Sequence, residues 1–227
     1  INKPIPVGGI IGHLGNLSGE IEYTLDNLIV SGQIITTCAC GGICGEMVEN
    51  NTYNWEKGEY FKKSRNLVSR VNIIFFNYGN SYPIGGICGI SFGNQIENSV
   101  SYSNLSGSGS VGGIIGKSEN GNTIIKNCGF YGTAMGEYSG GIVGYNTNIV
   151  NITNCFSGGK LMGLYPGGII GYKNQNSSQT IKTSFWDKET TGCTRTVGNI
   201  EGNKEGKTTT ELNDITTYDT GYWTASG

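Results

Sequence analysis

The chain has 227 residues, a net charge of −2 at pH 7 and only 14% charged residues. This balance offers no basic surface for nucleic acid and no polybasic patch for a membrane, and no apolar run is long enough to span a bilayer. Hydrophobic residues make up 36% of the chain, enough to bury a core, so its 39 glycines do not indicate disorder.

A five-residue pattern, Gly-Gly-Ile-x-Gly, recurs along most of the chain. Its six copies occupy 8–12, 41–45, 85–89, 112–116, 140–144 and 167–171. They begin 33, 44, 27, 28 and 27 residues apart, which predicts a repeat of about 27 residues with insertions in the first two units. The glycine pairs indicate either bends with positive φ or places where neighbouring repeats approach too closely for a Cβ.

The second unit is the longest, and we assign its excess to an insertion within 46–84. Its segment 50–66 combines aromatic and charged side chains, which include Tyr53, Trp55, Tyr60, Phe61, Lys62 and Lys63. Insertions in repeat folds are often functional, and aromatic rings beside charges suit contact with a sugar or a protein. We therefore expect 50–66 either to contact a partner or to fold down over the flank of the repeats.

A second landmark follows the glycine motifs. The stretches "IENSVSYS" (96–103), "IKNCGFYG" (125–132) and "ITNCFSGG" (152–159) align, with "IKTSFW" (181–186) as a degenerate copy. The alignment places Asn98, Asn127 and Asn154 in one column, and stacked amides can hydrogen-bond along such a column. The alternative is that these asparagines only begin turns. In the second unit, both Asn66 and Asn72 fit the column.

These elements predict an all-β fold. No segment keeps the apolar spacing of a helix, and short β-branched or aromatic runs alternate with Gly, Asn and Ser. We expect a parallel β-solenoid (a right-handed β-helix) of about six coils of about 27–28 residues. The solenoid would span 1–186, and 187–227 would cap its C-terminal end.

The same residues resemble a known repeat family. The series "GGIIG", "IKNCGFYG", "GGIVGY", "ITNCFSGG" and "GGIIGY" is similar to the GLUG repeat of bacterial and viral surface proteins and adhesins. The resemblance covers residues 8 to about 192 and is strongest from 85 onward. The tail, with "SFWDKETTG", "GKTTTEL" and "GYW", resembles the segment that follows such repeats. The resemblance implies an extracellular β-solenoid within a larger surface protein, and it supplies no catalytic residues.

Four of the seven cysteines occupy repeat positions. Cys44 and Cys88 share a slot that holds Ile or Val in other units, and Cys128 and Cys155 share another. Cysteine in such slots behaves as a small buried hydrophobe. Stacked cysteines also lie within disulfide range, so both states stay open. The Cys-x-Cys-x₃-Cys pattern that ends at Cys44 lacks further ligands, so we expect no metal site.

Enzyme chemistry finds few candidates in the sequence. No acidic column recurs at the repeat spacing, and His13 is the sole histidine. "EGKTTT" (205–210) lacks the earlier glycine of a phosphate-binding loop. We therefore expect no catalytic residue and no cofactor. Candidate N-glycosylation sites are Asn16, Asn50, Asn104, Asn151 and Asn176.

The sequence favours a non-enzymatic structural or adhesive surface module of a cell envelope, an extracellular fibre or a virion. One alternative is a carbohydrate-binding module that acts through 50–66, and a less favoured one is a polysaccharide-degrading β-helix enzyme. The expected partners are protein subunits or surface glycans, with neither nucleic acid nor membrane insertion. The module would be extracellular, on a cell or virion surface, and either a homo-oligomer, a fibre or part of a longer chain.

Overall fold

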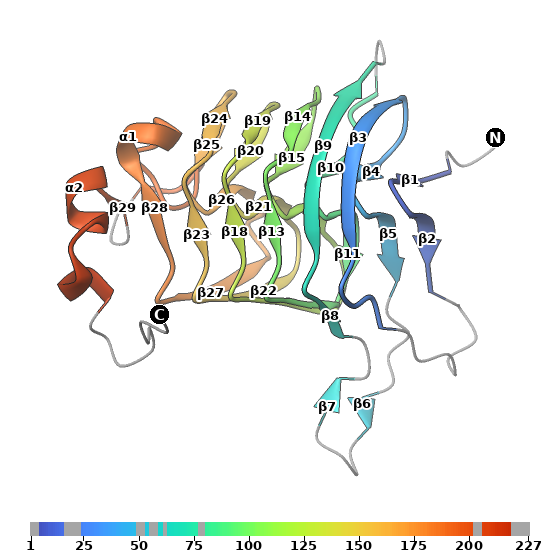
Figure 1. Ribbon diagram of the computed structural model, residues 1–227, viewed down its shortest axis with the longest axis horizontal. Coiled ribbons are helices and arrows are strands. Elements are labelled where there is room, and N and C mark those ends of the chain that lie inside the picture. Colours follow the sequence, from blue (N-terminus) through green and yellow to red (C-terminus); the bar gives the residue numbers. More distant parts are fainter. Residues whose placement is uncertain are drawn as a thin grey trace.

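The computed structural model describes residues 5–15, 24–48, 53–54, 59–60, 63–76, 80–201 and 206–218. Short β-strands run around one axis, and each stacks on its copy in the next coil (Figure 1). The first strands lie at one end of this rod and the short helices at the other. The predicted all-β parallel β-solenoid is confirmed.

Two six-stranded parallel sheets, A and B, carry the glycine motifs. The first glycine of each motif pairs with its copy in the next coil, as Gly8 does with Gly41 and Gly112 with Gly140. Six stacked copies enclose about five turns, close to the predicted coil number. Sheet A contains β1 (Val7–Gly8), β4 (Cys40–Gly41), β10 (Ile84–Gly85), β15 (Ser110–Gly112), β20 (Tyr138–Gly140) and β25 (Tyr165–Gly167). Sheet B contains β2 (Ile11–Leu14), β5 (Cys44–Val48), β11 (Cys88–Phe92), β16 (Ile115–Ser118), β21 (Val143–Asn146) and β26 (Ile170–Lys173).

Sheets C and D complete each coil. In sheet D the first two coils contribute one long strand each, whereas later coils contribute two short strands with a break between them. Sheet C contains β8 (Lys63–Arg65), β12 (Gln95–Glu97), β17 (Asn122–Lys126), β22 (Ile149–Thr153) and β27 (Ser178–Lys182). Sheet D contains β3 (Ile29–Thr36), β9 (Val68–Phe75), β13 (Val100–Ser101), β14 (Asn104–Ser106), β18 (Gly129–Phe130), β19 (Thr133–Met135), β23 (Phe156–Ser157), β24 (Lys160–Met162), β28 (Phe185–Asp187) and β29 (Gly206–Lys207).

Close approach, rather than positive φ, explains the glycine pairs. No glycine of the six motifs is among the described residues with positive φ. A Cβ on Gly113 would overlap the Gly141 carbonyl oxygen of the next coil and the Phe130 ring. A Cβ on Gly168 would likewise overlap the ring of Trp186, which crosses the core from sheet D. The second glycine of each pair therefore gives room to the side chain that faces it across the rod.

A continuous apolar core runs along the rod axis. The isoleucines of the last five motifs, from Ile43 to Ile169, are fully buried. Cys44 pairs in register with Cys88, and Cys88 with Ile115, as the repeat alignment requires. Cys128 and Cys155 are also buried, and all seven cysteines are free thiols. Cysteine therefore serves as a small core residue in these coils.

The C-terminal end carries one coil segment that the sequence alone did not reveal. Val197 forms a parallel bridge with Ile170, and the Arg195 carbonyl accepts a hydrogen bond of 2.8 Å from the amide of Gly168. This segment lies in the predicted cap, 187–227, but lacks the Gly-Gly-Ile motif. The helices α1 (Lys188–Thr191), α2 (Thr209–Leu212) and η1 (Ile215–Tyr218) lie at this end of the rod (Figure 1).

The insertion of the second coil is shorter than the predicted 46–84. Met47 and Ile73 are fully buried, and β8 pairs in parallel with β12, so these parts of the segment belong to the coil itself. Between them, β6 (Tyr53–Asn54) and β7 (Glu59–Tyr60) pair antiparallel. Figure 1 shows β6 and β7 away from the body of the rod.

Candidate functional site: the outer face of sheet D

The aromatic segment 50–66 divides into two parts in the structure. Tyr53 lies opposite Tyr60 in the hairpin of β6 and β7, of which only the backbone is described. Lys63 begins β8 and pairs with Gln95 on the solenoid. Trp55, Phe61 and Lys62 lie outside the described residues. The segment is therefore a hairpin followed by a coil strand, and its role as a contact stays a prediction.

The structure brings the three ladder asparagines together. Asn127 Nδ2 donates to Asn98 Oδ1 at 2.9 Å, and Asn154 Nδ2 donates to Asn127 Oδ1 at 3.3 Å. Thr183 continues the ladder, because its hydroxyl donates to Asn154 Oδ1. All four residues also have a left-handed backbone, with φ between 44° and 53°. The column thus combines the two expectations: each residue makes a turn, and each side chain bonds to the next.

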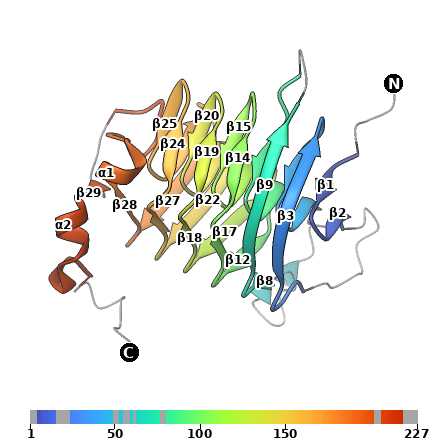
Figure 2. The same ribbon diagram turned by 45° about the horizontal axis from the view of Figure 1, so that its top comes forward.

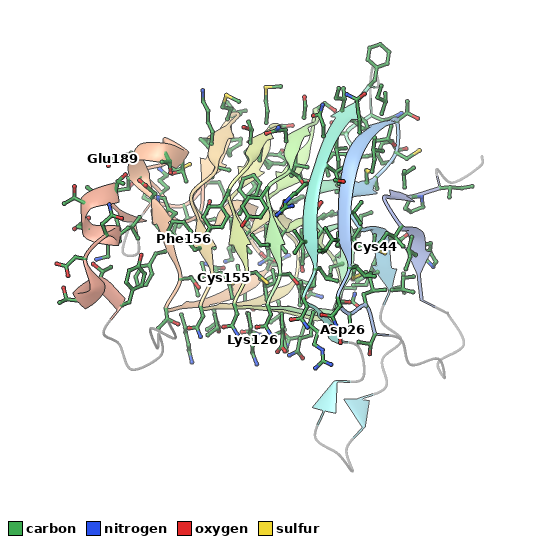
Figure 3. All side chains as sticks on the ribbon, in the orientation of Figure 1. Asp26, Cys44, Lys126, Cys155, Phe156 and Glu189 are labelled. Carbon is green, nitrogen blue, oxygen red and sulfur yellow. The ribbon has the colours of Figure 1, made fainter. Side chains whose placement is uncertain are left out.

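In the second coil, Asn66 rather than Asn72 occupies the asparagine column. Asn66 has φ 55°, like Asn27 before it, whereas Asn72 pairs with Asn104 inside sheet D. The Asn66 amide does not continue the ladder to Asn27, because it donates instead to Asp26 Oδ1 at 2.8 Å. Asp26 and Lys126 both project from the lower edge of the rod in Figure 3, beside this row of turns.

The candidate glycosylation sites fall in different settings. Asn104 lies in β14 with an exposed side chain, and Asn176 lies in an exposed turn. Asn151 lies in β22, where its Nδ2 donates to Asn122 Oδ1 at 2.6 Å. A glycan at Asn151 would break that bond, so Asn104 and Asn176 are the more accessible acceptors. Asn16 and Asn50 lie outside the described residues.

The structure places His13 beside Glu46. Its Nδ1 lies 3.2 Å from Oε2 of the buried Glu46, on the outer side of sheet B. Across the described ranges, no three His, Cys, Asp or Glu side chains gather as a metal site would require. Within the same ranges, no helix has the length and apolarity needed to cross a membrane.

The outer face of sheet D gathers exposed apolar side chains that the core does not use. Ile29 and Ile35 in β3 are 71% and 68% exposed, and Met135 in β19 is 45% exposed. Register pairing aligns Ile35, Ile74, Ser106, Met135 and Met162 in one outward column of the sheet. Ile29, Val68, Val100, Gly129, Phe156 and Phe185 align in a second column. Figure 2 shows strands of this sheet, from β3 and β9 to β24, side by side along the rod.

A row of aromatic rings runs along the same face. The Arg70 guanidinium carbon lies 5.4 Å from the centroid of the Tyr102 ring, which stacks at 5.5 Å and 21° on Tyr131. Tyr131 in turn lies 5.6 Å from Phe156, which Figure 3 shows on this face. Partial burial raises the pKa of the Tyr131 hydroxyl above its ordinary value of 10.0. The row provides a rigid aromatic surface with one cation at its end.

A shallow depression of about 210 Å³ lies beside the aromatic row. Its walls are the polar column of Asn72, Asn104 and Thr133 and the apolar column that ends in Met135 and Met162. Amide and hydroxyl groups here can bond to a ligand while the methionines adapt to its shape.

This face suits recognition of a broad surface. It is largely apolar, with aromatic rings and hydrogen-bonding groups beside the apolar columns, and its charged residues include Arg70 and Lys160. Sequence reasoning missed Tyr102 and Tyr131, although "SVSYS" and "CGFYG" align them in one column. That alignment could have indicated a row of stacked tyrosines, but it did not show that the column faces outward.

Comparison with known proteins identifies the fold but no family. No family model matches the chain, and no curated protein matches it. A crystal structure from Bacteroides ovatus, whose name assigns it provisionally as an immunoglobulin A1 protease, has a similar fold, with a TM-score of 0.57. The match has 19% identity and covers 92% of this chain and 69% of the other. Identity this low shows a shared fold alone, and membership in the GLUG-repeat family stays a prediction.

Proposed function

We propose that the chain is a non-enzymatic, extracellular β-solenoid module with a structural or adhesive role. It would act on a cell envelope, an extracellular fibre or a virion, as GLUG-like repeats would, and bind a protein partner on the outer face of sheet D. The observation that carries this proposal is the concentration of exposed Ile29, Ile35, Tyr102, Tyr131 and Met135 on one sheet. Contact sites combine such an apolar and aromatic centre with a more polar rim.

The proposal does not extend a protease activity from the Bacteroides ovatus protein to this chain. At 19% identity the likeness carries no residue of a catalytic site. The rod itself supplies what a structural module needs, because its register repeats from coil to coil and its core is continuous. A repeat fold of this kind presents extended surfaces to its partners.

Charge substitutions on matched surfaces test this proposal. Met135→Asp places a carboxylate on sheet D, and Ile149→Asp places one on sheet C, where Ile149 has the same 45% exposure as Met135. We expect Met135→Asp to weaken binding about tenfold or more and Ile149→Asp to leave it unchanged. Binding would be measured by sedimentation, for self-association, and on immobilised extracellular matrix proteins. Equal binding by both variants would show that the outer face of sheet D is not the binding surface.

The projecting hairpin favours a second candidate, a carbohydrate contact through 50–66. Replacing 50–62 by a short Gly-Ser turn would leave β5 and β8 in place. We expect the solenoid to stay folded, since an exposed insertion tolerates removal better than a coil does. Loss of glycan binding with an unchanged melting temperature would support this candidate. A melting temperature lowered by more than about 10 °C would instead show that the hairpin stabilises the fold.

A further inference from the structure

Four tyrosines form a compact cluster on the last two complete coils, away from sheet D. Tyr138 begins β20 and Tyr165 begins β25, while Tyr145 and Tyr172 lie in β21 and β26. Each pair stacks in register across the coils, Tyr138 on Tyr165 and Tyr145 on Tyr172. The centroid of the Tyr138 ring lies 5.5 Å from that of Tyr145, 5.8 Å from that of Tyr165 and 4.7 Å from that of Tyr172.

The fold does not require tyrosine at these four positions. The residue that pairs with Tyr138 in the preceding coil is Ser110, and the one that pairs with Tyr145 is Lys117. One coil earlier still, Ile90 pairs with Lys117. On its other side, Ile90 pairs with Glu46 of the coil before. Small, charged and aliphatic side chains therefore all fit these outward columns. The coil therefore forms without aromatic rings at these positions.

The cluster lies on the outer side of the rod and presents ring faces in two directions. Its four side chains are half-buried, while neighbours such as Ser139 are fully buried. The Tyr172 ring meets those of Tyr145 and Tyr165 at 84° and 79°. In sheet D, by contrast, Tyr102 and Tyr131 cover each other's faces in a near-parallel stack. The cluster therefore suits a ligand that packs its C–H groups on aromatic faces.

One ion pair and one carboxylate border the cluster. Lys117 Nζ lies 5.8 Å from the Tyr145 ring centroid and forms a 2.9 Å ion pair with Glu119 Oε1. A hydrogen bond to Glu137 raises the pKa of the Tyr138 hydroxyl to about 12, so this hydroxyl stays a neutral donor at physiological pH. The surface thus offers hydroxyl groups, a lysine that is paired with Glu119, and the carboxylate of Glu137. A carboxylate at this place would repel an anionic ligand.

Size also limits what the cluster can bind. It spans two adjacent coils, which stack about 4.8 Å apart, whereas a stable protein interface covers about 800 Å² per partner. A patch this small and aromatic, with hydroxyl groups and one carboxylate at its rim, matches a short, uncharged polyhydroxylated ligand better than a protein surface. We propose that the cluster of Tyr138, Tyr145, Tyr165 and Tyr172 is a binding site for a neutral saccharide.

A microarray of neutral oligosaccharides with heparin and polysialic acid as anionic probes tests this proposal. We expect the wild-type module to bind at least one neutral glycan with an affinity that does not depend on salt, because no counterions are released. The double variant Tyr145→Ala with Tyr172→Ala should lower the association constant about tenfold or more. No binding to any neutral glycan, or binding only to the anionic probes, would overturn the proposal.

Two further variants separate binding from folding. Replacing all four tyrosines by Phe keeps the rings but removes the hydroxyls, so melting should change little while glycan affinity falls several-fold. If this variant binds as tightly as the wild type and the alanine variant merely unfolds, the cluster is structural and the proposal fails. The matched control, Tyr102→Ala with Tyr131→Ala on sheet D, should leave glycan binding unchanged. That control also separates this site from the protein-binding face proposed above.

Discussion

At the scale of single residues, Asn127 shows how one side chain serves both the turn and the stack. It has φ 52°, and its amide bonds to Asn98 below it and Asn154 above it. Asparagine is one of the few residues other than glycine that visit this region at low cost. The repeat therefore selects asparagine twice, for its backbone and for its side chain.

Two substitutions at Asn127 should separate these contributions. Asn127→Ala removes the amide and adds backbone strain, so we expect it to lower the free energy of unfolding by about 1–3 kcal/mol. Asn127→Gly removes the amide but keeps the turn, and should cost about 1 kcal/mol less than Ala. Chemical denaturation of both variants gives the two values. Equal losses would mean that strain contributes nothing, and a loss below half a kcal/mol in Ala would mean that the ladder is fully solvated.

The buried thiols make a second prediction at this scale. Burial raises the pKa of Cys44 to about 12 from an ordinary value of 9.0, and it raises the pKa of Cys88 in the same direction. In the unfolded chain these thiols lose their protons near pH 9, while in the folded chain they keep them. The stabilisation is therefore complete below pH 9 and is lost as the pH rises from 9 towards 12.

Unfolding curves across this pH range test the effect. Each such thiol should contribute at most about 1.4 kcal/mol of lost stability per pH unit. The control is the variant Cys44→Val with Cys88→Val, since Val143 occupies the same slot two coils after Cys88. We expect this variant to show a shallower alkaline loss than the wild type. An identical slope would show that other groups, such as tyrosines and lysines, account for it.

At the scale of the coil, the second glycine of each motif has no room for a Cβ, whichever side chain faces it across the core. Gly113 faces Phe130, Gly141 faces Ser157 and Gly168 faces Trp186. The side chain opposite the glycine thus varies from serine to tryptophan, while the glycine stays. The backbone of the next coil explains this for Gly113 and Gly141, because the carbonyl oxygens of Gly141 and Gly168 lie 2.1 and 2.3 Å from the place of a Cβ. At Gly168 the ring of Trp186 itself fills that place.

Alanine substitutions at two glycines separate the cost of this steric overlap from the general cost of replacing a glycine. Gly113→Ala would place a methyl group against backbone that cannot move away, so we expect a loss above about 3 kcal/mol in unfolding free energy. In Gly129→Ala the nearest atom is the outer edge of the Tyr131 ring, 3.0 Å away, which can shift. That variant should change stability by less than about 1 kcal/mol. Similar losses in thermal or chemical unfolding would contradict the close-approach explanation.

At the scale of the whole molecule, further segments lie over the C-terminal end of the rod. The C-terminal end has the segment around Val197 and the short helices, and Trp186 beneath them is fully buried, with Nε1 donating to the Cys193 carbonyl at 3.2 Å. A stacked sheet without a cap exposes unpaired backbone groups that can pair with another chain. We therefore expect the C-terminal segments to keep the last coil from stacking on a neighbour.

Truncation after Gly192 should uncover this end. We expect the shortened chain to self-associate and to melt more than about 10 °C lower, because Trp186 and the edge of β26 become exposed. Removing only the residues from 206 onward leaves the bridge of Val197 to Ile170, so its effect should be smaller. Sedimentation velocity and thermal unfolding measure both outcomes. A monomeric, fully stable truncated rod would show that the last coil needs no cap.

The sequence by itself determined the solenoid, the register of its coils and the asparagine column. Each of these depends on equivalent residues recurring at a fixed spacing, as the copies from Gly85 to Gly167 do, and stacking then places like on like. Only the tertiary structure showed the coil segment at Val197, which pairs through its backbone without the motif. Only the tertiary structure showed which tyrosine rings lie in contact. Tyr138 and Tyr172 are far apart in sequence and lie in different sheets, so no local pattern relates them, and the path of each coil around the core sets their distance.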